Sequence, residues 1–126
     1  GMLDFQLTDF MFNRAKGFHG PFKSKLIKDS DFKKIDENIF FELIFKIITQ
    51  KRKDTPLISE DRKNTFMEKI ELMTNKETDF FVFNKKLSDE PQNYEHEWSH
   101  ALTEYHEFLI LNYSINNIFC LLLAYD

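Results

Sequence analysis

Glycine is confined to the first part of this chain, and this distribution restricts the structures that the remainder can adopt. The three glycines are Gly1, Gly17 and Gly20, so residues 21–126 must make every turn without one. Glycine-rich phosphate loops and the dinucleotide-binding fingerprint both need glycines at fixed positions beside a helix. The sequence therefore excludes these sites across most of the chain.

Apolar periodicity predicts a mostly α, helix-rich single domain over residues 1–126. Its central element is an apolar helix over 30–53, with Ser30 as N-cap and three cations, Lys51–Lys53, at its C-terminal end. A second helix is expected from Ser59 to about Asn75, with acidic residues in its first turn.

The second half of the sequence is less uniform. A small β element is expected near 79–84, where Phe80–Phe83 form an apolar run between polar neighbours. A further helix is expected from Ser88 to about Leu111, because its apolar residues recur at helical spacing. Residues 115–125 fit either a terminal helix or a buried strand. The alternative fold is therefore α+β with a C-terminal hairpin.

Fifteen phenylalanines, together with abundant Lys, Ile and Asn, are typical of an AT-rich bacterial genome. Their positions nevertheless predict core residues: Phe32, Phe40, Phe41, Phe45, Phe66, Phe80–Phe83 and Phe108. The single cysteine, Cys120, lies in an apolar run and is expected to be an inert buried thiol in a reducing, cytoplasmic environment. The longest apolar run has eight residues, too few to span a membrane.

Charge is distributed unevenly along the chain. Residues 1–53 hold 11 Lys and Arg against 7 acids, whereas the last 40 residues hold seven acids and no Lys or Arg. A non-enzymatic protein-interaction or regulatory module is the leading hypothesis, with a protein partner or a homo-oligomer contacting the acidic C-terminal region. No cofactor, nucleic acid or membrane is expected as a partner.

One motif carries the chemistry of an enzyme. Residues 96–100 read His-Glu-Trp-Ser-His, which matches H-E-x-x-H, so two imidazoles one helical turn apart can bind Zn²⁺ and Glu97 can act as general base. With His106, the segment resembles the metzincin zinc-peptidase signature, which implies the ligands His96, His100 and His106. Thr103 replaces the glycine of that signature, and a continuous helix would carry His106 away from the other two. A zinc-dependent hydrolase is therefore the alternative function.

The loop over residues 15–29 interleaves cations with Phe18 and Phe22. Lys16, Lys23 and Lys25 could hold a phosphate or another anion there. The other interpretation is that the two phenylalanines anchor the loop to the core while the lysines are solvated. The net charge of −4 favours this second interpretation, because proteins that bind nucleic acid usually carry a basic excess.

Overall fold

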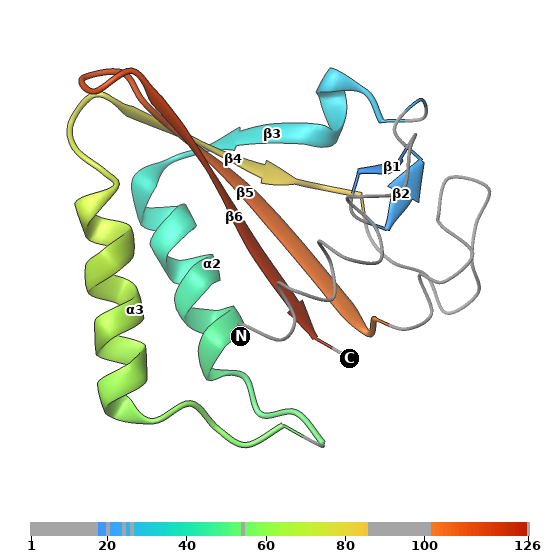
Figure 1. Cartoon of the computed structure of the whole chain (residues 1–126), viewed down its shortest axis with the longest axis vertical. Helices are drawn as coiled ribbons and strands as arrows, with labels where there is room; N and C mark the ends of the chain where they lie inside the picture. Colours follow the sequence, from blue (N-terminus) through green and yellow to red (C-terminus); the bar gives the residue numbers. More distant parts are fainter. Residues whose placement is uncertain are drawn as a thin grey trace. The chain divides into compact units, whose positions relative to one another are not determined.

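The computed structural model describes residues 18–19, 21–23, 25, 27–53, 55–85 and 102–125. They form a mixed α and β structure around a four-stranded antiparallel sheet with strand order β3-β4-β5-β6 (Figure 1). The elements are β1 (Phe18–His19), β2 (Phe22–Lys23), η3 (Asp29–Asp31), β3 (Phe32–Ile35), α2 (Glu37–Thr49), α3 (Glu60–Leu72), β4 (Thr78–Phe83), β5 (Glu104–Asn112) and β6 (Asn117–Tyr125). The expectation of a mostly α domain is wrong, because two segments predicted as helix contribute strands. Within the described ranges, no helix is both long and apolar enough to cross a membrane.

Helix α2 is shorter than the predicted helix over 30–53. It begins after Asp36, whose carboxylate accepts a hydrogen bond of 2.8 Å from the backbone N–H of Ile39. Asp36 is thus the N-cap, and the expected cap Ser30 lies in the short 3₁₀ helix η3. The residues between Ser30 and Asp36 include strand β3. In this strand, Phe32 packs against Phe83 of β4 with ring centroids 4.9 Å apart. A tertiary contact has therefore overridden the local helical pattern.

Helix α3 confirms the prediction made from its N-cap. The Ser59 hydroxyl accepts a hydrogen bond from the backbone N–H of Arg62, and the helix ends at Leu72 with Met73 as C-cap. The strand expected over 80–83 is also present, as the last four residues of β4.

The helix expected to reach Leu111 is wrong from Glu104 onwards, because Glu104–Asn112 form strand β5. Residues 117–125, for which helix and strand were both open, form strand β6. The turn between these strands contains Asn116 with φ of 52°. Asparagine tolerates this left-handed conformation better than most residues, so the hairpin turns without glycine.

The described chain divides into two compact units. The first comprises Gly1–Lys33, Val82–Phe108 and Leu121–Asp126 and has a core around the fully buried Phe22. The Phe22 ring lies 5.3 Å from that of Phe83 and 5.6 Å from that of Tyr105, measured between centroids. Phe22 is therefore a core residue, whereas the side chain of Phe18, the other anchor in that interpretation, lies outside the described residues.

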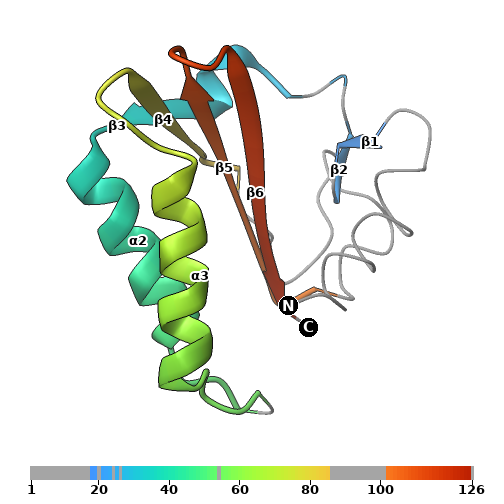
Figure 2. The same ribbon diagram turned by 60° about the vertical axis from the view of Figure 1, so that its left-hand side comes forward.

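The second unit comprises Lys34–Phe81 and Leu109–Cys120. Its core joins α2 to β4, since Phe40 stacks on Phe80 with ring centroids 4.4 Å apart. Helices α2 and α3 lie side by side (Figure 2), and Lys63 of α3 places its ammonium 5.3 Å from the centroid of the Phe45 ring. Phe45 is 47% exposed, so its assignment to the core is wrong. Helix α2 buries one stripe, formed by Phe40, Ile44, Ile47 and Ile48, and Phe45 lies outside it.

Candidate functional site

The predicted zinc ligands fall mostly outside the described residues. His96, Glu97 and His100 lie there, while His106 lies in the middle of β5. Its Nε2 atom is 3.1 Å from Oε1 of Glu104, two residues away on the same side of the strand. In the part of the chain that the structure describes, no three His, Cys, Asp or Glu side chains come together in a way that could hold a metal ion.

Of the three lysines in the predicted anion site, the structure describes Lys23 and Lys25. Lys16 lies outside the described residues. Lys23 is half-buried in β2, which pairs with β1 through the Phe18–Lys23 and His19–Phe22 partners, and Lys25 is exposed. The acidic C-terminal surface is also described only in part. Of its seven acids, the structure describes Glu104, which is half-buried, and Glu107, which is buried.

Strand β6 is an uncharged edge strand. Its sequence, Asn-Ile-Phe-Cys-Leu-Leu-Leu-Ala-Tyr, contains no charged residue, proline or glycine over nine residues. Among the described strands it is last in the sheet order, with β5 on one side only (Figure 2). Ile118 is 72% exposed, and Cys120, two residues further on the same side of the strand, is exposed as well. The expectation of a buried thiol is therefore wrong, because the apolar run that suggested it lies at the edge of the sheet.

A polar network joins the end of β5 to the residues that follow α3. The buried side chain of Asn112 donates to the backbone carbonyl of Met73 at 3.0 Å and accepts from the side chain of Asn75 at 3.2 Å. Its Oδ1 atom also accepts from the backbone N–H and the hydroxyl of Ser114, at 3.2 and 2.8 Å. Asn75 in turn accepts from the backbone N–H of Glu77 at 2.8 Å. Every polar atom of the Asn112 amide group thus has a partner, which indicates a structural role.

An ionic chain lies beside this network. The Tyr113 hydroxyl donates to Oδ2 of Asp79 at 2.8 Å, and the ammonium of Lys34 lies 3.4 Å from Oδ1 of the same carboxylate. The hydrogen bond to Asp79 is the main reason that the pKa of Tyr113 is raised above its ordinary value. This chain links β3, β4 and the β5–β6 turn within the second unit.

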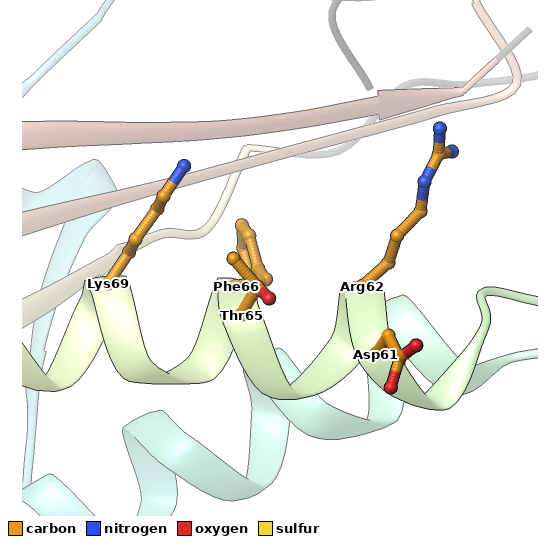
Figure 3. Close-up of a pocket in the computed structure, with 5 residues that line it drawn as sticks. All are labelled: Asp61, Arg62, Thr65, Phe66 and Lys69. Carbon is orange, nitrogen blue, oxygen red and sulfur yellow. The ribbon is translucent and has the colours of Figure 1, made fainter.

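One face of α3 bears an open pocket of about 290 Å³, lined by Asp61, Arg62, Thr65, Phe66 and Lys69. Arg62, Phe66 and Lys69 project from the same side of the helix, with the Phe66 ring between the two cations (Figure 3). Neither cation forms an ion pair with a described residue, whereas the neighbouring Lys63 pairs with Glu60 at 2.7 Å. We refer to Arg62, Thr65, Phe66 and Lys69 as the α3 face.

Neither the exposed edge of β6 nor the α3 face was predicted from the sequence. The sequence places Phe66 in the core, whereas the structure has it half-buried on α3, yet a signal for this surface is present. Arg62 and Lys69 have no acid three or four residues before or after them, while Lys63 has Glu60. No comparable sequence signal predicts that β6 is exposed, because the exposure of a strand depends on its position in the order of the sheet.

No family model, curated protein sequence or solved structure matches this chain, so its function must be inferred from its own residues.

Proposed function

We propose that this chain is a non-enzymatic interaction module that associates with a second copy of itself through β6. The observation that carries the proposal is a nine-residue strand without charge at one edge of the sheet. In the proposed dimer, β6 of one protomer pairs antiparallel with β6 of its partner.

The two edges of the sheet differ in a way that supports this assignment. Edge strands expose backbone N–H and C=O groups, and proteins usually protect them with short length, lysine, proline or bulges. Strand β3, at the other edge, has four residues and carries the exposed cations Lys33 and Lys34. Strand β6 is nine residues long and contains neither lysine nor proline.

A two-fold pairing also suits the composition of β6. Antiparallel pairing around a two-fold axis places the same strand opposite itself, so a charged residue near the axis would meet its own copy. Because β6 carries no charge, the pairing brings no like charges together. It would also give the exposed Ile118 side chain a neighbour across the interface.

Sedimentation equilibrium over a range of protein concentrations tests the proposal. The chain should approach twice its mass of 15.2 kDa as concentration rises. Ile118→Lys should weaken self-association by about tenfold, because it places a cation on each side of the axis. Leu57→Lys is the matched control, since Leu57 is a 62% exposed aliphatic residue outside the strands, and it should leave association unchanged.

A monomer at every concentration would overturn the proposal. An equal effect of both lysine substitutions would also overturn it, because the association would then depend on net charge rather than on β6. Thermal melting of both variants establishes that each is folded.

A zinc-dependent hydrolase that uses His96, Glu97 and His100 is the alternative proposal. The pair formed by His106 and Glu104 supports it, because metal-ligating histidines commonly bond a carboxylate through their second nitrogen. Metal analysis of protein purified without a metal-affinity tag decides between the two proposals. Stoichiometric zinc that His96→Ala removes would favour the hydrolase, and sub-stoichiometric zinc unchanged by that substitution would end it.

A further inference from the structure

We propose that one face of the sheet in the second unit packs against the same face of a second copy of this chain. Four apolar side chains and one ion pair form this surface, which we call the open sheet face: Lys34, Asp79, Phe81, Leu109, Leu111 and Ile118. It is distinct from the hydrogen-bonding edge of β6. Face packing and β6 pairing together give a tetramer, so the tetramer rests on the proposed function, whereas the face packing does not.

The pairing of β4 with β5 places four of these residues on one face. The backbone N–H of Tyr113 donates to the carbonyl of Glu77 at 2.9 Å, which fixes the register of the two antiparallel strands. Residues directly opposite each other in such a pair share a face of the sheet. Two opposite pairs follow on the same face: Leu111 with Asp79, and Leu109 with Phe81.

The neighbouring strands add one residue each. The ammonium of Lys34 in β3 lies 3.4 Å from the Asp79 carboxylate, so Lys34 belongs to the same face. Strand β5 ends at residue 112 and β6 begins at 117, so the four-residue turn between them sets Ile118 opposite Leu111. The open sheet face therefore crosses all four strands of the sheet.

The opposite face of β4 and β5 is covered, and the open sheet face is not. Phe80 stacks on Phe40 of α2 with ring centroids 4.4 Å apart, and Ile110 is fully buried. On the open sheet face, Leu109, Leu111 and Phe81 are only half-buried, and Ile118 is 72% exposed. Antiparallel sheets usually present polar side chains on a face that meets water. An apolar face of this kind therefore indicates a contact surface.

The charge on the face favours a second copy as the occupant. Its one cation and one anion, Lys34 and Asp79, have side chains that are 64% and 31% exposed, so the face is neutral but polarised. A two-fold axis can place Lys34 of each copy beside Asp79 of the other, whereas a face with charge of one sign would repel its own copy. A strongly charged partner such as a nucleic acid would gain no net attraction from this face.

Face packing is also compatible with the proposed β6 pairing. Antiparallel pairing of β6 with its own copy has its two-fold axis perpendicular to the sheet, so the open sheet faces of both copies lie on the same side. Two such dimers can then pack face to face, with their sheets about 10 Å apart and their apolar side chains between them. The result is a tetramer with three perpendicular two-fold axes.

Sedimentation equilibrium of the full chain tests the proposal. Pairing through β6 alone stops at twice the mass of 15.2 kDa, whereas face packing adds a second step that leads toward four times that mass as concentration rises. Leu111→Lys should weaken this second step at least about tenfold and leave the β6 dimer intact, because it places like charges in the packed face. Leu57→Lys is the control, since Leu57 is 62% exposed and lies outside the strands, and it should leave the tetramer unchanged.

The outcomes separate this proposal from the proposed function. A wild-type mass that never exceeds that of a dimer, and that Leu111→Lys leaves unchanged, would overturn the face packing and leave the β6 pairing standing. A dimer that Leu111→Lys converts to monomer, without protection of the β6 amides from exchange, would support the face packing and overturn the β6 pairing. Thermal melting establishes that the variant is folded.

Binding of an anilinonaphthalene sulfonate dye, which reports exposed apolar surface, requires no variant. Dye bound per chain should fall as protein concentration rises, because face packing covers the open sheet face. Undiminished dye binding would mean that the face stays open to a different partner, and would overturn the proposal.

Discussion

Replacing Asn112 with alanine should destabilise the fold more than any exposed polar substitution. The Asn112 side chain is 3% exposed and makes four hydrogen bonds, one as donor to the Met73 carbonyl and three as acceptor from Asn75 and Ser114. These bonds join the loop after α3 to the turn that leads into β6. Alanine removes all four and offers no replacement.

The magnitude follows from what each partner can do afterwards. Met73 is half-buried, so its carbonyl loses a bond that water replaces poorly, at a cost of about 1–3 kcal/mol. Asn75 and Ser114 are exposed and can turn to water, so their three bonds together add about 1 kcal/mol. The expected loss is therefore about 2–4 kcal/mol, which lowers the melting temperature of a chain of this length by about 8–15 °C.

Denaturant unfolding followed by circular dichroism measures this loss. Asn84→Ala is the matched control, because Asn84 is an exposed asparagine at the end of β4 whose backbone, and not its side chain, bonds to Asp31. It should change stability by less than about 0.5 kcal/mol. If Asn112→Ala were as stable as Asn84→Ala, the reasoning about the network would be refuted.

Two further substitutions test the packing and the electrostatics. Phe40→Ala should cost about 3–5 kcal/mol in the same unfolding assay, because Phe40 is fully buried against Phe80. Phe45→Ala on the same helix should cost about 1 kcal/mol or less, and similar costs for the two would contradict the burial pattern of α2. Asp79→Asn should lower the pKa of Tyr113, since the hydrogen bond to the Asp79 carboxylate raises it. This bond stabilises the fold below the ordinary pKa of tyrosine, and the stabilisation is lost as pH rises through the raised pKa. Alkaline absorbance titration, with Tyr113→Phe to identify the phenol, checks this shift, and an unchanged titration would count against it.

Local signals were sufficient to predict part of the fold. Ser59 followed by Glu60 and Asp61 predicted α3, because the capping hydroxyl and first-turn acids act within one helical turn. The apolar run Phe80–Phe83 predicted the last four residues of β4 for the same reason, since the run itself fits a strand. Both predictions depended on residues close together in the chain.

Strand β5 was missed because its burial does not follow one alternation. Tyr105 and Glu107 are buried at odd positions, and Phe108, Ile110 and Asn112 are buried at even positions. The change of side between Glu107 and Phe108 removes the period of two by which a strand is recognised. Two polar residues among the buried positions, Glu107 and Asn112, weaken the pattern further.

The exposed edge of the sheet could not be predicted from the sequence, for a physical reason. Cys120 and Ile118 lie in an apolar run that looks like core, and only the order of strands places them at an edge. Strand order depends on pairings between distant residues, which no local pattern records. The unpaired cations of the α3 face, in contrast, were readable from the sequence.

Amide hydrogen exchange at two protein concentrations tests the central claim most directly. If β6 pairs with β6 of a second copy, the amides of Asn117–Tyr125 that point away from β5 should exchange more slowly at high concentration than at low concentration. The amides of β3, at the opposite edge, should exchange at the same rate in both samples. Equal exchange of β6 at both concentrations, or protection that appears at β3 instead, would contradict the assignment of β6 as the interaction edge.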